Sequence, residues 1–284
     1  MKINKVCILG AGTLGSRIAL QSVISGFEVR VYDIQESAFE ASRKMMAKVL
    51  KQIKMDASII DQILFTTDPM EAVLDADIIS ESVTEDLALK QQVWAQFGAI
   101  APEKTIFTTN TSYLLPSQIA DFTGRPSLFC AFHFHDVFYS TVVDIMPHSG
   151  TSEHLISILE DFGRALNQVP VVVRKENHGY IFNSMLMALI GSAGKLRTKE
   201  VASIEDIDKS WMVNFHMPMG PFGILDSIGL DTAWHVTHKL EDPASQAFAS
   251  LVKTYIDAGK LGEKTGEGFY TYPNPAYRDP DFLN

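Results

Sequence analysis

The chain has 284 residues, 46% of them hydrophobic, which is enough for two packed domains. Its formal charge of −10 and pI near 5.2 argue against nucleic acid or an anionic membrane as the main partner, because both would repel the chain. No stretch approaches the ~18 to 20 apolar residues of a membrane span. The two cysteines, Cys7 and Cys130, lie in apolar runs typical of buried strands. These features predict a cytoplasmic protein without a disulfide framework.

Short apolar runs alternate with amphipathic stretches in the first 177 residues. The predicted strands are, in chain order, residues 6–9, 29–32, 64–66, 78–79, 105–109, 128–132, 142–146 and 169–173. The predicted helices between them are residues 14–25, 37–53, 87–101 and 153–166. This alternation is typical of an α/β fold with a doubly wound, mainly parallel sheet and helices on both faces.

The pattern changes after Asn177. Residues 180–196 form a long apolar pattern with helical spacing, and few strand-like runs follow it. Glycine and proline mark turns at residues 217–223 and 262–268. We therefore predict two domains, residues 1–177 with the sheet and residues 178–284 with helices only, joined by a linker near residues 174–179.

A glycine-rich turn follows the first predicted strand and opens a helix. Its residues are Gly10, Ala11, Gly12, Thr13, Leu14 and Gly15. In such a motif the first glycine permits the tight turn, the second lets the backbone approach a pyrophosphate, and the third allows close packing of helix on strand. The phosphate lies at the positive N-terminus of the helix. The segment therefore predicts a dinucleotide site.

The end of the second predicted strand indicates which dinucleotide binds. Asp33 stands there, where a carboxylate accepts hydrogen bonds from the adenosine ribose and repels a 2'-phosphate. NAD is therefore the predicted cofactor rather than NADP. Two nearby cations, Arg17 and Arg30, would soften this preference if they faced the ribose. In a nucleotide-free fold, Asp33 would serve only as a strand-end cap.

Three later side chains suit chemistry on a carbonyl or hydroxyl group. Ser112 follows one predicted strand and His133 closes the next, so both lie at the carboxyl edge of the sheet, where ligands bind. Oxidation of an alcohol by hydride transfer needs a base for the hydroxyl proton, and histidine titrates nearest neutral pH. Asn183 stands in an apolar helix, where an amide needs a partner. Their plainer roles would be a turn residue, a core histidine and an interdomain hydrogen bond.

Several motifs follow one another along nearly the whole chain. They are GAGTLGSRIA, VYD, SESVTEDLALK, TNTS, the HF pair at His133, GYIFNS, EDIDKSW to PMGPFGILDSIGLD, and KTGEGFYTY. With these motifs the chain resembles the 3-hydroxyacyl-CoA dehydrogenase family. The resemblance implies a Rossmann-type NAD-binding domain, a helical C-terminal domain, and hydride transfer between NAD(H) and C3 of a 3-hydroxyacyl or 3-ketoacyl substrate.

The resemblance also implies roles for individual residues. It makes His133 the general acid/base, and it makes Ser112 and Asn183 hydrogen-bonding groups around the substrate oxygen and the cofactor. Near NAD it places Glu85, Lys90 and Lys264. It further implies a homodimer formed through the helical domain, with residues 180–196 and 211–229 as the expected interface.

The segment after His133 departs from the family pattern. A family run of the form HFFNP...K.VE reads HFHDVFYSTVVDIM here, with one residue fewer. The acidic residue that pairs with the histidine in the family becomes Asp144, shorter by one methylene. Such a carboxylate orients the ring and raises its basicity. Asp136 is a rival partner for His133, and His135, which shares its strand face, is a rival base.

The substrate is less closely defined than the reaction. The segment 34–63 is short for the part of the family that contacts coenzyme A, although it offers Lys44, Lys48, Lys51 and Lys54. We expect a 3-hydroxyacyl-CoA of fatty acid metabolism. The alternatives are a free 3-keto or diketo compound, as in the diketoreductase branch, or a 3-hydroxy sugar acid. From another class, a catalytically weakened NAD-binding sensor remains an alternative.

Overall fold

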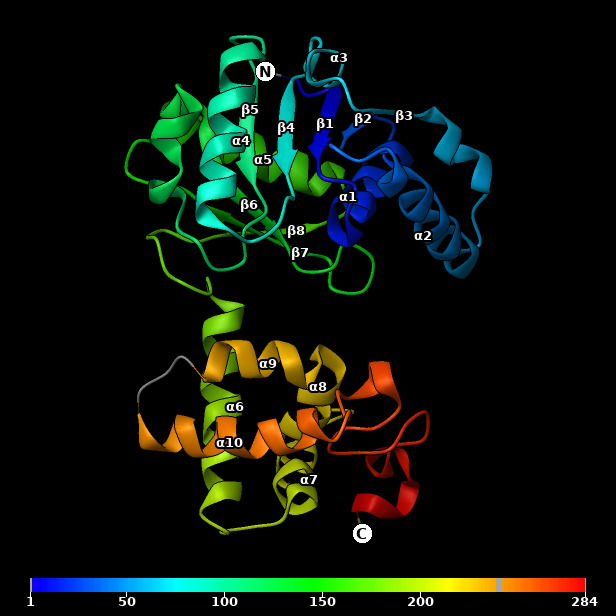
Figure 1. Cartoon of the computed structure of the whole chain (residues 1–284), viewed down its shortest axis with the longest axis vertical. Coiled ribbons are helices and arrows are strands. Elements are labelled where there is room, and N and C mark those ends of the chain that lie inside the picture. The colour runs from blue at the N-terminus through cyan, green and yellow to red at the C-terminus, as the bar shows by residue number, and fades with distance from the viewer. Residues whose placement is uncertain (1, 239–241, 284) are drawn as a thin grey trace. The chain divides into compact units, whose positions relative to one another are not determined.

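The structure is a computed structural model that describes residues 2–238 and 242–283. The chain divides into two compact units, Met1–Ile181 and Phe182–Asn284 (Figure 1). The predicted boundary after residue 177 lies in the segment that connects the last strand of the first unit to the first helix of the second.

The first unit is built on one sheet of eight strands. The strands are β1 Lys5–Leu9, β2 Glu28–Tyr32, β3 Ile63–Thr66, β4 Ile78–Glu81, β5 Ile106–Thr109, β6 Phe129–Phe134, β7 Val142–Met146 and β8 Val169–Val172. Their spatial order is β3-β2-β1-β4-β5-β6-β7-β8, and all neighbours are parallel except β6 and β7. This is the doubly wound, mainly parallel sheet that the sequence predicts.

Helices cover both faces of this sheet (Figure 1). They are α1 Thr13–Ile24, α2 Ser37–Ile53, α3 Pro69–Val73, α4 Leu87–Ile100 and α5 Glu153–Ala165, with short 3-10 turns at Ala57–Gln62, Pro116–Gln118, Ala120–Thr123 and Pro126–Leu128. Alternate residues of a strand point to opposite faces. In β1, Val6 and Ile8 pack with α1, α2 and α5, whereas Cys7 and Leu9 pack with α3 and α4. Because both faces of β1 are buried, it is a continuous apolar run from Val6 to Leu9.

The direction of winding reverses next to β1. From β1 the chain passes through α1 to β2 on one side, whereas β4 lies on the other side of β1. In open α/β sheets, ligands bind beyond the carboxyl ends of the strands at such a reversal. The topology therefore marks the carboxyl ends of β1, β2 and β4 as the expected cofactor position.

The second unit consists of helices and turns over its described residues, as the sequence predicts. Its helices are α6 Phe182–Thr198, α7 Ile204–Phe215, α8 Pro221–Ile228, α9 Leu230–Thr237 and α10 Pro243–Asp257, with 3-10 turns at Glu263–Thr265, Ala276–Arg278 and Pro280–Leu283. The turn predicted at residues 217–223 is half wrong, because α8 begins at Pro221, and proline suits the first helical position. No helix among the described residues has the length and apolar character needed to cross a bilayer.

A buried carboxylate organises the start of α8. Asp208 accepts hydrogen bonds from the backbone N–H groups of Phe222 and Gly223, at 2.8 and 3.0 Å, and from the Tyr270 hydroxyl at 2.9 Å. Burial raises the pKa of Asp208 to about 6, although these hydrogen bonds act in the opposite direction. Asp208 therefore ties α7 to α8 and to the C-terminal segment of the unit.

Candidate active site

A cavity of about 930 Å³ lies at the carboxyl ends of β1, β2 and β4. Leu9, Asp33 and Ser82, which end or follow these three strands, line it together with Gly12. Its position is the one that the reversal of winding indicates. The glycine-rich turn and Asp33, which the sequence places near a dinucleotide, are therefore brought together in one cavity.

The glycines of the turn suit a bound dinucleotide for different reasons. A Cβ on Gly15 would lie 2.1 Å from the backbone oxygen of Gly10, so this position is closed by the protein itself. A Cβ on Gly12 would meet no atom within 4 Å, so the space beside Gly12 is open to a ligand. The buried hydroxyl of Ser82 lines the same cavity and lacks a hydrogen-bond partner among the described residues. Open space and an unpaired donor fit the pyrophosphate of NAD.

Asp33 is held in place by backbone groups. Its Oδ2 accepts a hydrogen bond from the N–H of Ala11 at 2.9 Å, and its Oδ1 accepts one from the N–H of Gln35 at 3.0 Å. The two cations that would offset its charge have partners of their own. Arg17 forms an ion pair with Asp136, and Arg30 contacts Glu28 and Asp75. The Asp33 carboxylate, which lines the cavity, is therefore held in one position and is not paired with Arg17 or Arg30.

A histidine and a carboxylate face each other across the antiparallel pair β6 and β7. The register places His133 directly opposite Asp144, and opposite residues on such strands have close side chains. Nδ1 of His133 lies 3.2 Å from Oδ2 of Asp144, and both side chains are buried. Asp144 therefore contacts the histidine, although its side chain is shorter than a glutamate and the segment after His133 has one residue fewer than the family pattern.

His135 shares the same carboxylate. It lies on the same face of the chain, and its Nε2 is 2.8 Å from Oδ2 of Asp144. Burial acts to raise the pKa of Asp144, but the hydrogen bonds and charges of His133 and His135 together outweigh it and hold that pKa below its usual value. Asp144 is thus a charged group bridging two imidazoles.

Asp136, the alternative partner for His133, forms other contacts. Its carboxylate pairs with Arg17 of α1 and accepts hydrogen bonds from the backbone N–H groups of Phe138 and Tyr139. It ties the loop after β6 to the helix that opens at the glycine-rich turn. Of the two carboxylates, Asp144 is the one that contacts His133.

Tyr180 completes the surroundings of His133. Its ring centroid lies 4.8 Å from that of His133, and its hydroxyl donates a hydrogen bond of 2.8 Å to the backbone oxygen of Thr111. Burial, together with nearby carboxylates, raises the pKa of Tyr180 well above its usual value. A neutral, hydrogen-bonded phenol therefore packs against the imidazole and fixes its position.

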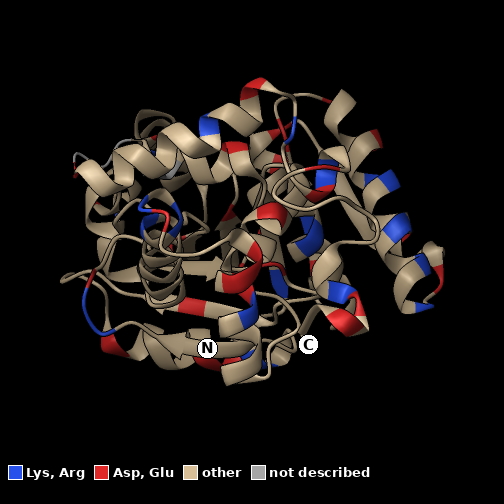
Figure 2. Cartoon of the chain, turned by 90° about the horizontal axis from the view of Figure 1, so that it is seen from below, with Lys and Arg blue, Asp and Glu red and all other residues tan. Residues whose placement is uncertain are grey.

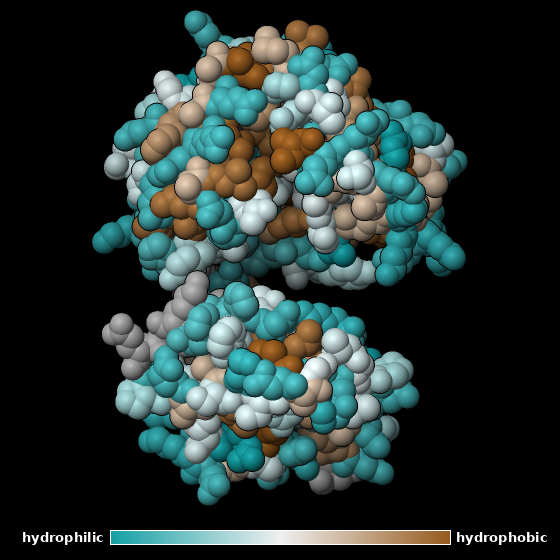
Figure 3. All heavy atoms as spheres, in the orientation of Figure 1, coloured by the Kyte–Doolittle hydropathy of each residue, from teal (hydrophilic) through white to brown (hydrophobic). Residues whose placement is uncertain are grey.

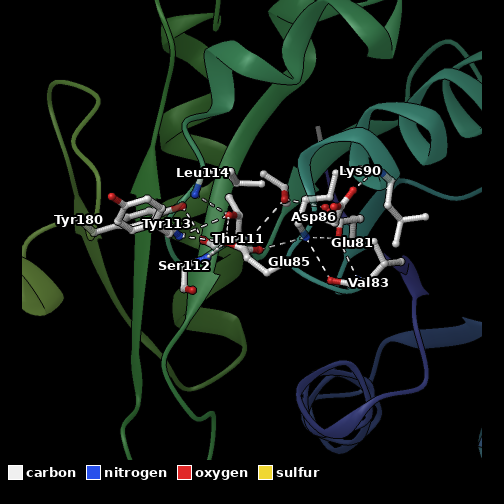
Figure 4. A network of polar contacts seen from close by, with 12 residues as sticks. Glu81, Val83, Glu85, Asp86, Lys90, Thr111, Ser112, Tyr113, Leu114 and Tyr180 are labelled. Atoms are coloured by element: carbon white, nitrogen blue, oxygen red, sulfur yellow. Dashed lines mark hydrogen bonds and ion pairs between the residues drawn. The ribbon is translucent and has the colours of Figure 1, made fainter. Parts of the chain in front are cut away.

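Glu85 holds the loop that carries Ser112 (Figure 4). Its Oε1 accepts hydrogen bonds from the backbone N–H groups of Ser112 and Tyr113, both at 3.1 Å, and from the Thr111 hydroxyl. The side chain of Ser112 itself is exposed at the carboxyl end of β5. The hydrogen bonds to Glu85 therefore fix the backbone of Ser112 in the loop that follows β5.

Lys90 is buried at one end of this network (Figure 4). Its Nζ lies 2.6 Å from Oε1 of Glu81, at the end of β4, and 3.5 Å from Oε2 of Glu85. Oε2 of Glu81 accepts a hydrogen bond of 2.6 Å from the Thr109 hydroxyl. Glu81, Lys90 and Glu85 thus form one chain of charges that links β4, α4 and the loop after β5.

Two residues that the resemblance assigns to the site belong to the second unit. Asn183 is on α6, and Lys264 is in the 3-10 turn after α10. The ammonium of Lys264 lies 2.6 Å from both carboxylate oxygens of Asp231. Their roles toward NAD and substrate stay predictions.

Residues 5–177 match the NAD-binding domain of 3-hydroxyacyl-CoA dehydrogenase, and residues 179–272 match its C-terminal domain. The chain belongs to the 3-hydroxyacyl-CoA dehydrogenase family. It is therefore an NAD-dependent oxidoreductase with a Rossmann-type domain and a helical C-terminal domain, as the resemblance implies.

Relatives of known name are similar along almost the whole chain. A probable 3-hydroxyacyl-CoA dehydrogenase of Caenorhabditis elegans is 32% identical, over 95% of this chain and 93% of the relative. A probable 3-hydroxybutyryl-CoA dehydrogenase of Bacillus subtilis is 30% identical, over 96% and 98%. Among solved structures, a diketoreductase that acts on dicarbonyl compounds has a TM-score of 0.91 at 38% identity, covering 96% of this chain and 100% of its own. The (S)-3-hydroxybutyryl-CoA dehydrogenase of Ralstonia eutropha has a TM-score of 0.84 at 30% identity, with the same coverage.

Sequence reasoning missed three features of the site. Glu81 ends a buried strand, where the sequence gives no sign of a charged pair, and no spacing rule indicates that Lys90 pairs with it. The apolar pattern of residues 180–196 predicts Tyr180 as the start of a helix, whereas it lies outside α6 and packs on His133. The sharing of Asp144 by two histidines could have been suspected, because residues 133 and 135 lie on one face of a strand.

Proposed function

We propose that this enzyme transfers a hydride between NAD(H) and C3 of a 3-hydroxyacyl or 3-ketoacyl substrate, with His133 as the acid/base. The observation that carries the proposal is the buried pair of His133 and Asp144 at the carboxyl edge of the sheet that holds the dinucleotide cavity. A base is needed at this edge because the substrate hydroxyl must lose a proton as its carbon loses a hydride.

In this mechanism, Nδ1 of His133 carries a proton and donates it in a hydrogen bond to Asp144. The other ring nitrogen, Nε2, then carries a lone pair. It accepts the hydroxyl proton in oxidation and gives the proton back in reduction. NAD, when bound, supplies the nicotinamide that exchanges the hydride. The negative charge of Asp144 stabilises the imidazolium that forms, and burial strengthens this interaction.

We assign to Ser112 and Asn183 hydrogen bonds that position the substrate oxygen and the cofactor. Glu85 supports Ser112 by binding the backbone of its loop. We further assign Glu85, Lys90 and Lys264 to the surroundings of NAD, Glu85 and Lys90 by holding the loops at the ends of β4 and β5. Gly10 to Gly15 and Asp33 form the cofactor site in this proposal.

For the substrate we propose a 3-hydroxyacyl-CoA. Basic residues lie on α2, among the blue segments of Figure 2, and one of them, Lys48, lines the dinucleotide cavity. A coenzyme A thioester carries phosphates that such lysines would bind. The names of the curated relatives favour the same class.

A second candidate is a reductase of free 3-keto or diketo compounds. The similarity to the diketoreductase favours it, since the TM-score of 0.91 covers 96% of this chain. The reaction at C3 is the same in both cases, and only the group beyond C1 differs.

The test is the loss of NADH absorbance with acetoacetyl-CoA and, in parallel, with a free 3-keto ester. Turnover of the thioester with far higher kcat/KM supports the coenzyme A assignment, whereas turnover of the free compound alone transfers the proposal to the diketoreductase type. If NADH binds, but neither a 3-keto compound with NADH nor a 3-hydroxy sugar acid with NAD⁺ is turned over, the proposal is wrong and an NAD-binding sensor is the better account.

We also propose a cytoplasmic homodimer that associates through the helical unit. Apolar side chains reach the surface of this unit (Figure 3), and Met185, Val213 and Phe215 are among them, each at least half exposed. Contiguous exposed apolar patches mark association surfaces, and we propose that these side chains belong to one. Sedimentation velocity at micromolar concentration should give a dimer for the native chain and a monomer for Phe215→Asp. A native monomer would reject the dimer.

A further inference from the structure

Three atoms that can bind a metal converge between β6 and β7. One ring nitrogen of His133, one of His135 and a carboxylate oxygen of Asp144 all lie within 4.8 Å of one another. Both imidazoles approach the same carboxylate oxygen, at 3.2 and 2.8 Å. The three side chains are largely buried, with side-chain exposures of 7%, 11% and 2%. A converging set of two imidazoles and one carboxylate is a ligand set that Zn²⁺ prefers.

We propose that His133, His135 and Asp144 bind one Zn²⁺ ion, and that the bound ion inhibits the proposed dehydrogenase reaction. Bonds of ~2.0 to 2.2 Å in tetrahedral geometry put ligand atoms about 3.4 Å apart. The two nitrogen–oxygen distances, 3.2 and 2.8 Å, are about 0.2 and 0.6 Å shorter, so rotations of the side chains that separate these atoms would admit the ion. Three protein ligands leave a fourth position for water.

The strands supply the rigidity that a metal site needs. His133 is directly opposite Asp144 in the register of β6 and β7, and His135 follows on the same face. The backbone N–H of His135 donates a hydrogen bond to the oxygen of Val142 at 3.3 Å, which continues the pairing beyond β6. The rings of His133 and His135 are 4.9 Å apart and tilted by 49°, so they converge without stacking. Sites built on strands hold their ligands more closely than sites on loops.

The ion would act on the proton chemistry of His133. A metal binds the lone pair of a ring nitrogen, so Zn²⁺ at Nδ1 requires that nitrogen to be without its proton, and the remaining ring proton is on Nε2. With Nε2 protonated, His133 has no lone pair to accept the hydroxyl proton of the substrate. Asp144, now a metal ligand, is also withdrawn from the imidazole. This inhibition, unlike the binding itself, rests on the proposed function.

The first experiment measures binding without any turnover. The full chain, treated with a chelator and freed of it, is titrated with Co²⁺ and followed by visible absorption, and Zn²⁺ is then added to displace Co²⁺. Matched variants are His135→Gln, which keeps a donor for Asp144 but loses the imidazole ligand, Asp144→Asn, and the control His154→Gln, an exposed histidine on α5. Circular dichroism verifies the fold of each.

We expect one Co²⁺ per native chain, with an absorption typical of low coordination, and displacement by Zn²⁺. His135→Gln and Asp144→Asn should each weaken binding by at least ~100-fold, the upper end of what loss of an outer-shell partner alone costs. His154→Gln should bind as the native chain does. Absence of stoichiometric binding, equal affinity in folded His135→Gln, or equal loss in His154→Gln would each overturn the proposal.

The second experiment compares oxidation of a 3-hydroxy substrate with and without free Zn²⁺, as a ratio within each variant. Zn²⁺ should suppress oxidation by the native chain and by His154→Gln, with recovery on chelation, and should affect His135→Gln far less. Stoichiometric Co²⁺ binding by a chain that turns over no 3-keto or 3-hydroxy substrate supports the metal site and removes only the proposed function. Turnover that Zn²⁺ leaves unchanged in a chain that binds the ion at these residues overturns the inhibitory role.

Discussion

Replacement of Asp144 by asparagine tests the central pair of the proposed mechanism. The substitution keeps the shape of the side chain and removes its negative charge. The hydrogen bond from His133 to Asp144 measures 3.2 Å, longer than the ~2.7 to 2.9 Å of the strongest charge-assisted bonds. We therefore take the lower part of the usual range for a bond to a charged group, ~1.5 to 2 kcal/mol. At about 1.4 kcal/mol for a tenfold change in rate, turnover should fall by about 10- to 30-fold.

The loss should be expressed in kcat rather than in KM. Asp144 stabilises the imidazolium, which exists only once the proton has moved, so kcat and kcat/KM should fall together. The assay is steady-state oxidation of the best 3-hydroxy substrate with NAD⁺, because in this direction the imidazolium forms during the reaction; it is run for Asp144→Asn and for Asp136→Asn. Asp136 pairs with Arg17 instead of His133, so its variant should slow the chemical step far less. A kcat near that of the native enzyme for Asp144→Asn, or a larger loss for Asp136→Asn, would refute the reasoning.

Three further predictions concern the cofactor and the stability of each unit. Gly12→Ala should leave the melting temperature unchanged, because its Cβ meets no protein atom, but should weaken NADH binding in a fluorescence titration, because the Cβ enters the space proposed for the cofactor. Gly15→Ala should instead destabilise the fold by about 1 to 3 kcal/mol, because its Cβ would lie 2.1 Å from the oxygen of Gly10. Equal effects of the two variants would contradict the proposed cofactor position. Asp33→Ser should raise kcat/KM with NADPH relative to NADH, and an unchanged ratio would show that another group sets the preference. Because folding raises the pKa of Asp208 from 3.8 to about 6, the contribution of Asp208 to the unfolding free energy should fall as pH rises through this interval. The difference in unfolding free energy between the native chain and Asp208→Asn, measured by denaturant titrations at several pH values, should therefore change over this interval, and a constant difference would contradict the raised pKa.

The sheet was predictable because its strands obey a strict local rule. A strand covered on both faces is mostly apolar, and β1 is apolar from Val6 to Leu9. The helices repeat their apolar residues with a different period, so the two elements separate cleanly in the sequence. The start of α8 was less predictable, because proline marks a turn as readily as it opens a helix. The contact of Asp208 with the N–H groups of Phe222 and Gly223 decides in favour of a helix start over a turn, and it joins residues that are distant in sequence.

The site likewise has parts that the sequence predicts and parts that it does not. The positions of Asp33 and Ser112 follow from strand ends, which the sequence marks. The partner of His133 does not, since it depends on the register of an antiparallel pair, and a shift by one residue would turn Asp144 to the other face. The family pattern pointed to Asp144, but a missing residue between the two left Asp136 as an alternative that only the register of β6 and β7 resolves.

The departures from the family pattern have a common physical basis in that register. An aspartate is shorter than a glutamate, but directly opposite His133 its oxygen comes within 3.2 Å, because side chains across antiparallel strands are already close. The same closeness brings His135, one position further along the face, within 2.8 Å of the same oxygen. A shorter carboxylate held between two imidazoles retains the partner that the proposed acid/base needs. It also creates the ligand set from which we infer a zinc site, so the chemistry proposed for this chain and its proposed inhibition depend on one atom, Oδ2 of Asp144.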